Sequence, residues 1–304
     1  MKQISDKATE QQNQASKNID QMNTSEILVT MNNEDKTVPN AVADAIPAIT
    51  EFVDAVVDSM KKGGRLFYVG AGTSGRLGVL DASEIPPTYS APGHLVQGIM
   101  CGGLDALVSA VEGAEDDAEE GYRIVDERGI TEHDCLLGIT TSGMAAYVHA
   151  ALKRTKEIGG TTGLLVCNEF KKTDDTDVLI KAVVGPEVVT GSTRMKAGTA
   201  TKLILNMITT AAMIKMNKTY GNLMVDLMTT NKKLWDRGAR IIRHCTGVEY
   251  DFGMEKLKES EGSVKTALVM VLLDIDAPAA RERLSKHDGA LRQVLDEEGK
   301  SLHI

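Results

Sequence analysis

Residues 65–75 read RLFYVGAGTSG, a short β-forming run that leads directly into a glycine-rich loop. Four further short apolar runs follow along the chain, and helical patterns such as 145–158 separate several of them; the runs are 95–100, 134–139, 161–167 and 178–184. Strands that alternate with helices predict a parallel sheet with helices on both of its faces. We therefore expect an α/β fold built on a doubly wound parallel sheet.

Helical patterns flank this region on both sides. Apolar residues recur at helical spacing over 38–60, and a long helix is expected near 193–216. Residues 1–25 are polar and suit either an arm or a frayed helix, whereas the chain beyond 230 carries charged helical patterns without a convincing strand. We expect three parts: an N-terminal helical arm at 1–50, the α/β domain at 51–220 and a small C-terminal helical domain at 221–304.

Composition and charge argue against several classes of partner. The chain has 304 residues, a formal net charge of −9 and only 4% aromatic residues, so it does not resemble a nucleic-acid-binding protein, which needs a basic face. Its N-terminus has no apolar segment typical of a secretory signal, and no apolar run approaches the roughly 20 residues that span a membrane. Four cysteines without a C-x-x-C pair suit neither a zinc site nor a disulfide framework. We expect a cytoplasmic protein.

The glycine loop admits two interpretations. GAGTSG at 70–75 fits the G-x-G-x-x-G pattern of dinucleotide sites, but that interpretation requires an acidic residue at the end of the second strand. The second strand here ends in IMCGG at 99–103, without a carboxylate. Two hydroxyls, Thr73 and Ser74, stand in the loop instead. Hydroxyls and backbone N–H groups at a helix N-terminus favour a phosphate monoester.

Two other turns carry the same chemistry. TTSG at 140–143 follows the third strand, and TGST at 190–193 precedes the long helix, with Arg194 and Lys196 close by. Each turn alone is more often a helix N-cap, but ligands of parallel sheets bind at the carboxyl ends of the strands, where these turns should meet. The candidate substrate-binding residues are Gly72, Thr73, Ser74, Gly75, Ser142, Gly143, Ser192, Thr193 and Lys196.

Two acidic clusters are candidates for acid–base chemistry. Glu84 is followed by Ile85 and then by the pair Pro86-Pro87. We expect the helix to stop there, because a residue that precedes proline disfavours the helical conformation. Glu112 and Glu115 are three residues apart and would share one face of a helix, although this pattern alone favours a solvated helix start.

Longer motifs resemble one known family. VGAGTSGRLGVLDASEIPPTY at 69–89 is joined by AVEGAEDDAE at 110–119, VVGPEVVTGSTRMKAGTA at 183–200 and YGNLMVDL at 220–227. Thr9-Glu10 with Asn13, and NNED at 32–35, fit the same pattern. The chain resembles the N-acetylmuramic acid 6-phosphate etherases from about residue 9 to 295. The regulator of glucokinase is related but much longer, with two such domains.

The resemblance implies a sugar isomerase (SIS) domain and a cytoplasmic homodimer that needs no metal or organic cofactor. It also implies a lyase that cleaves the D-lactyl ether of N-acetylmuramic acid 6-phosphate in cell-wall sugar recycling. The family's two catalytic glutamates correspond to Glu84 and Glu115. The resemblance assigns Glu84 to protonating the departing lactate and activating water, and Glu115 to removing the C2 proton.

One turn departs from the family pattern. Where the family commonly reads Ala-Ser-Gly-Arg-Thr-Pro-Tyr, residues 141–147 read TSGMAAY, so Met144, Ala145 and Ala146 replace the arginine, threonine and proline. This loss of a charge and a hydroxyl predicts weaker phosphate binding. It also keeps open the alternative of a sugar-phosphate-binding regulatory protein without turnover. A third alternative is an aldose–ketose isomerase, which shares the fold and the carboxylate chemistry.

Overall fold

The computed structural model describes residues 6–302, and the chain divides into two compact units. The first unit comprises Met1–Ser83 and His94–Thr210, and the second comprises Glu84–Gly93 and Ala211–Ile304. Helix α3 (Gly72–Tyr89) therefore begins in the first unit and ends in the second. The three-part division expected from the sequence stays a prediction.

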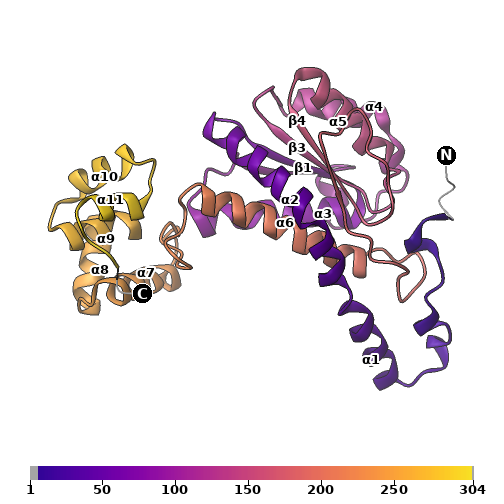
Figure 1. Ribbon diagram of the computed structural model, residues 1–304, viewed down its shortest axis with the longest axis horizontal. Helices are drawn as coiled ribbons and strands as arrows, with labels where there is room; N and C mark the ends of the chain where they lie inside the picture. Colours follow the sequence, from indigo (N-terminus) through magenta and orange to yellow (C-terminus); the bar gives the residue numbers. More distant parts are fainter. Residues whose placement is uncertain (1–5, 303–304) are drawn as a thin grey trace. The chain divides into compact units, whose positions relative to one another are not determined.

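A five-stranded parallel sheet forms the centre of the first unit, in the order β2-β1-β3-β4-β5 (Figure 1). The strands are β1 (Leu66–Gly70), β2 (Val96–Met100), β3 (Cys135–Ile139), β4 (Thr161–Val166) and β5 (Val178–Lys181). All five correspond to runs that the sequence predicted. In the register, Gly70 lies opposite both Met100 and Ile139, so three strands end level with one another.

Alternating side chains divide the two faces of the sheet. Phe67 belongs to an apolar cluster with α4 (Ala118–Glu127) and α5 (Ala146–Ile158). On the other face, the hydroxyl of Tyr68 donates to Asp81 of α3, and Asp81 also accepts from Asn206 of α6 (Lys196–Lys215). Helix α2 (Val38–Lys61) covers this face as well, as Phe52 packs against Gly163 of β4. Helices on both faces confirm the doubly wound fold (Figure 1).

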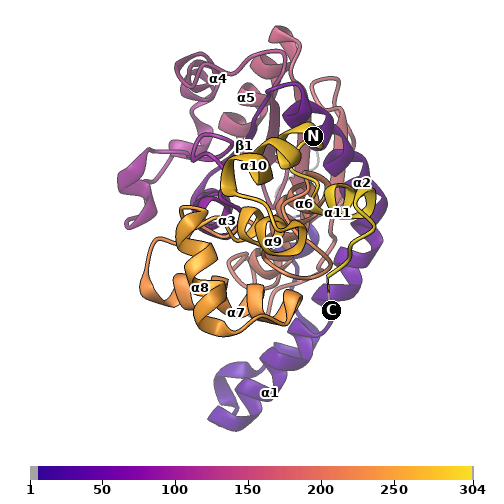
Figure 2. The same cartoon turned by 90° about the vertical axis from the view of Figure 1, so that its left-hand side faces the viewer.

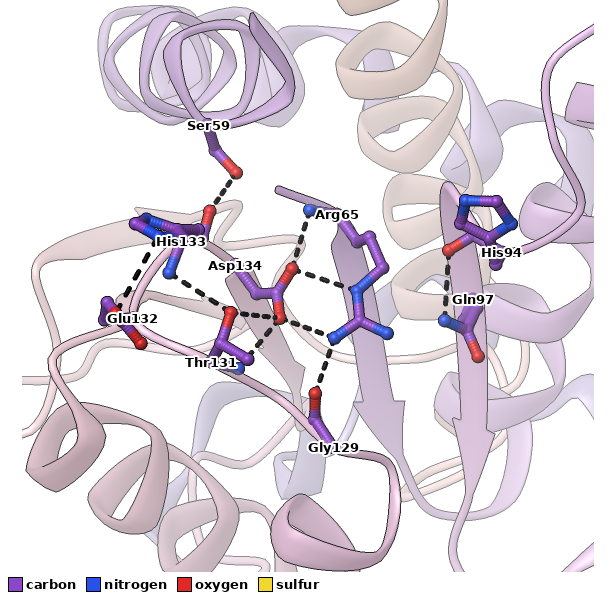
Figure 3. A network of polar contacts seen from close by, with 9 residues as sticks. All are labelled: Ser59, Arg65, His94, Gln97, Gly129, Thr131, Glu132, His133 and Asp134. Carbon is purple, nitrogen blue, oxygen red and sulfur yellow. Dashed lines mark hydrogen bonds and ion pairs between the residues drawn. The ribbon is translucent and has the colours of Figure 1, made fainter. Parts of the chain in front are cut away.

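A buried carboxylate joins the starts of β1 and β3 (Figure 3). Asp134, whose side chain is 1% exposed, accepts from the backbone N–H of Arg65 at 2.7 Å, from Arg65 Nη2 at 2.7 Å and from the backbone N–H of Thr131 at 2.8 Å. Burial favours a raised pKa for Asp134, but these donors outweigh it, so its pKa lies below the usual value. The ionised carboxylate therefore stabilises the junction of the two strands.

Hydrogen bonds hold the N-terminal segment against the rest of the first unit. It forms the short 3₁₀ turns η2 (Ala8–Glu10), η3 (Gln14–Ser16) and η4 (Ile19–Gln21), then α1 (Thr24–Asp35). The backbone N–H of Thr9 donates to Asn168 Oδ1, and Ser16 Oγ donates to the carbonyl of Val188. These contacts bring the segment beside the carboxyl ends of the strands, which neither of the two sequence interpretations of residues 1–25 anticipated.

The second unit is helical, as expected for the end of the chain (Figure 2). Its helices are α7 (Lys232–Thr246), α8 (Tyr250–Glu259), α9 (Val264–Leu273), α10 (Ala277–Lys286) and α11 (Leu291–Glu297). Helix α9 is buried from Val264 to Met270 and lies at the centre of an apolar cluster. Within residues 6–302, no helix is long and apolar enough to cross a membrane.

Helix α3 does not stop at Glu84, so that expectation is wrong. The helix continues through Pro86 and Pro87 to Tyr89. Each proline removes one N–H from the helix ladder. Ile85 and Tyr89 are buried, and the backbone N–H of Met228 donates to the carbonyl of Pro87 at 3.3 Å. Packing of this last turn offsets the two lost backbone bonds.

Candidate active site

A cavity of about 290 Å³ lies where the strands of the first unit end. Ala71 follows β1, and Gly72, Thr73 and Ser74 begin α3; all four line the cavity. The loop after β3 contributes Thr140, Thr141, Ser142 and Ala145, and Thr193 comes from the turn before α6. The predicted meeting of the three hydroxyl-rich turns is therefore confirmed. We call this space the first cavity.

The glycine loop allows the start of α3 to approach β1 closely. Gly72 has φ +54°, a conformation that favours glycine, and a Cβ on Gly75 would lie 2.3 Å from the carbonyl oxygen of Gly70. Helix α3 begins at Gly72, and the first N–H groups of a helix have no intrahelical acceptor. Together with the hydroxyls of Thr73 and Ser74, these N–H groups suit a dianionic phosphate.

Phe170, which does not line the cavity, lies against the turn after β3. Gly143 has φ +75°, and a Cβ there would lie 2.4 Å from the ring of Phe170. Ser142 Oγ accepts from the backbone N–H of Met144 at 3.2 Å, which leaves its hydroxyl hydrogen available to a ligand. Ala145 lines the cavity without a polar atom on its side chain, whereas Met144 is 37% exposed and does not line it.

The predicted cation of the pocket already has a partner. Lys196 Nζ lies 2.7 Å from Glu34 Oε2, and the lysine side chain is 3% exposed. Burial favours a raised pKa for Glu34, but the hydrogen bonds from Lys196 and Asn13 outweigh it, so the pKa of Glu34 is lowered. Lys196 does not line the first cavity, and neither do Arg194, Ser192, Gly75 or Gly143.

No lysine, arginine or histidine lines the first cavity among residues 6–302. An anionic ligand there relies on backbone N–H groups and hydroxyls. These donors act without a formal charge, and the helix dipole of α3 adds to them.

The two candidate glutamates occupy different units. Glu115 lies in the 3₁₀ turn η6 (Ala114–Asp116), is exposed and lines the first cavity. Glu112 lies outside any helix, because Gly113 with φ +75° separates it from η6, so the two side chains do not share a helix face. Glu84 is exposed on α3, belongs to the second unit and does not line the cavity.

Six lining residues were not predicted as site residues, and three of them have polar side chains: Glu10, Thr140 and Thr141. The other three are Ala71, Ile139 and Ala145. Glu10 reaches the cavity because the N-terminal segment is fastened there, and a Cβ on Gly191 would lie 2.9 Å from Glu10 Oε2. The pattern Thr9-Glu10 was noted in the sequence as part of the family resemblance, without a role. That match was the signal that pointed to Glu10.

The cysteines are buried and chemically quiet. Burial raises the pKa of the Cys101 thiol to about 12, and Glu115 and Asp117 add to the effect. All four cysteines are free and buried, which confirms their interpretation as core residues. In the part of the chain from 6 to 302, no group of three or more metal-ligating side chains is gathered.

Comparisons with known proteins find similarity over nearly the whole chain. The glucokinase regulatory protein N-terminal SIS domain matches residues 48–156. An N-acetylmuramic acid 6-phosphate etherase of Pectobacterium atrosepticum is 47% identical over 288 residues, which cover 94% of this chain and 95% of the relative. The etherase of Salinibacter ruber is 48% identical over 296 residues, covering 97% and 95%. That of Clostridium acetobutylicum is 48% identical over 294 residues, covering 96% and 97%.

Proposed function

The chain belongs to the N-acetylmuramic acid 6-phosphate etherase family, and from this premise we propose that Glu84 and Glu115 are its catalytic acid and base. The protein is a carbon–oxygen lyase. It cleaves the D-lactyl ether of N-acetylmuramic acid 6-phosphate, giving N-acetylglucosamine 6-phosphate and D-lactate, a reaction of cell-wall sugar recycling.

The reaction is an elimination followed by addition of water. Opening of the sugar ring exposes an aldehyde at C1, which makes the C2 proton acidic enough for a carboxylate to remove. Loss of lactate from C3 gives an unsaturated aldehyde, and water then adds at C3. In our proposal Glu115 removes the C2 proton, while Glu84 protonates the departing lactate and activates the water. General acid–base help of this kind contributes roughly 10²- to 10⁴-fold in rate.

The observation that carries the proposal is the first cavity. It combines the hydroxyl-rich turns with Glu115 in one lining. We propose that Gly72, Thr73, Ser74, Ser142 and Thr193, which line this cavity, bind the 6-phosphate. Gly75, Gly143, Ser192 and Lys196 lie outside the lining, so we assign them to holding the turns in place. A phosphate held at the turns would orient the sugar carbons toward the carboxylate, which converts binding into a favourable geometry for proton transfer.

A homodimer and a cytoplasmic location are part of the proposal. Helix α1 has no buried residues and exposes Leu28 and Val29, which a second copy would cover. The four free thiols suit a reducing compartment.

D-lactate release tests the function directly. Purified protein should release D-lactate from N-acetylmuramic acid 6-phosphate and much less from the sugar without its phosphate. Absence of D-lactate would overturn the assignment. Tight binding without release would then favour a regulatory binding protein, and a rearranged sugar with an intact ether would favour an isomerase.

Ala145→Thr should strengthen phosphate binding. The substitution restores the hydroxyl that the family carries there, and Ala145 already lines the first cavity. A hydrogen bond to a charged group contributes about 1.5–3 kcal/mol, so we expect at least roughly tenfold tighter binding of N-acetylglucosamine 6-phosphate by calorimetry. Ala145 is also the N-cap of α5 and makes no capping bond, so threonine should raise stability by about 1 kcal/mol.

Ala145→Val is the matched control, because valine has the shape of threonine without its hydroxyl. Equal affinity of the Thr and Val variants for the sugar phosphate would contradict the prediction.

A further inference from the structure

A second cavity of about 200 Å³ adjoins the first within the same unit. Ala71, Gly72 and Glu115 line both spaces. Because these residues belong to both linings, the two spaces lie next to each other at Glu115. The second cavity is not needed for the phosphate or for the sugar carbons next to it.

Arg76 is the one cationic side chain in this lining among residues 6–302, and the lining also contains the carboxylates of Glu112 and Glu115. Arg76 stands in the first turns of α3, and its Nε donates to the carbonyl of Leu107 at 2.9 Å. Nη2 donates to the carbonyls of Ala106 at 2.7 Å and Ser109 at 3.4 Å. Among the residues that the structure describes, no carboxylate forms an ion pair with Arg76, and Nη1 makes no hydrogen bond. The carbonyls orient the guanidinium without neutralising it, so it can still bind an anion.

Most of the remaining lining is apolar. Ala106, Ala110, Val111 and Ala114 contribute small side chains, and Met100 and Cys101 complete the apolar part. Glu112 and Glu115 also line the cavity, but both side chains are exposed, so water and salt screen their charges. The cavity therefore suits a short group that carries one methyl and one carboxylate.

We propose that the second cavity binds the lactyl arm of the substrate, with its carboxylate on Arg76 and its methyl against the alanines. This subsite rests on the proposed function. The lactyl ether is attached at C3, next to the C2 carbon at which we place Glu115. With the phosphate in the first cavity, the lactyl arm projects past Glu115 into the second. Arg76 is then a specificity-determining residue that separates lactyl ethers from sugar phosphates lacking this arm.

A pair of substrates and a pair of proteins test the subsite. The substrates are N-acetylmuramic acid 6-phosphate and its lactyl carboxamide, in which the negative charge is removed. The wild-type protein should prefer the acid by roughly 10- to 100-fold in kcat/KM, as expected for a charge-assisted hydrogen bond. In Arg76→Gln this preference should disappear, while the inhibition constant of N-acetylglucosamine 6-phosphate, which has no lactyl arm, stays within about twofold. Arg194→Gln, which removes an exposed charge outside both linings, should keep the preference.

Two outcomes would overturn the subsite. The first is full retention of the preference for the acid in Arg76→Gln. The second is that Arg76→Gln weakens binding of the sugar phosphate and of the lactyl substrate by the same factor, which would mean that Arg76 only holds the 106–109 turn. Ala110→Leu supplies an independent readout, because it leaves Arg76 in place and fills the cavity from an exposed position. It should raise KM for the lactyl substrate and spare binding of N-acetylglucosamine 6-phosphate.

Failure of the function is distinguishable from failure of the subsite. If the wild-type protein releases neither D-lactate from the acid nor D-lactamide from the carboxamide, the etherase assignment is wrong. Calorimetric binding of the same two compounds to the wild-type protein and to Arg76→Gln then decides whether Arg76 recognises the carboxylate.

Discussion

Glu115→Gln should lower the rate of D-lactate release roughly 10²- to 10⁴-fold, because glutamine keeps the shape of the side chain and cannot accept the C2 proton. Glu115 lines the first cavity and is exposed, so the substitution removes no buried contact. The thermal unfolding midpoint should therefore stay unchanged. The measurement is kcat for D-lactate release at saturating substrate, followed by enzymatic detection of the lactate.

Glu119→Gln is the matched control for Glu115. It removes the same charge four residues away, from an exposed position in α4 that lines neither cavity. Its effect on kcat should remain small compared with that of Glu115→Gln. Equal losses in the two variants would mean that general electrostatics, and not proton transfer by Glu115, is responsible.

Glu84→Gln should cause a loss of similar size through the acid step. The side chain is exposed on α3, so folding should again be preserved. Ser83→Ala, the neighbouring exposed position on the same helix, is the control for disturbance of α3. Unchanged turnover of Glu84→Gln would remove this residue from the mechanism and leave Glu115 to be judged by its own variant.

Asp134→Asn should lower the free energy of unfolding by about 3 kcal/mol, the lower end of the range for breaking a buried ion pair. The lower end applies because Arg65 is 24% exposed, whereas Asp134 is 1% exposed. Asparagine places an amide N–H₂ where an acceptor is needed, so donors from Arg65 and Thr131 lose their partner (Figure 3). Urea-induced unfolding followed by circular dichroism measures the difference.

The effect of Asp134 should also depend on pH. Because its pKa is lower in the folded state than in the unfolded chain, its stabilisation is complete above about pH 4 and is lost as pH falls through the folded pKa. The gap between the wild-type protein and Asp134→Asn should therefore narrow in acid. Asp126→Asn, which breaks an exposed pair with Arg154, should cost at most about 1 kcal/mol. A gap that stays constant into strong acid would contradict the assigned role of the charge.

The strands of the central sheet could be predicted from the sequence because each is a short apolar run followed by a turn. The run at 65–69 and the glycine loop after it became β1 and the start of α3. The prolines after Glu84 misled the prediction, since the usual effect of proline on a helix was overridden by burial of Ile85 and Tyr89. Rules based on near neighbours in the sequence predicted the strands and their turns correctly. They failed at the end of α3, where tertiary packing outweighs the usual effect of proline.

Charges in the candidate site were harder to predict. Lys196 looked like a phosphate ligand from its position beside a hydroxyl-rich turn, yet its ammonium pairs with Glu34, which is 162 residues away in the chain. Glu10 lines the first cavity because Thr9 is bound to Asn168, 159 residues further on. Pairings over such separations leave no periodic pattern in the sequence.

The order of strands and helices, the three hydroxyl-rich turns and the family membership all followed from residues close together in the chain. These features depend on hydrogen bonds and side-chain periodicity between near neighbours, so a linear sequence contains them. Folding decided three features of the site. It determined which carboxylate lines the cavity, which cation is already paired, and that the Arg76 guanidinium lines the second cavity. Such features depend on distances between segments that only the packed sheet and its loops bring together.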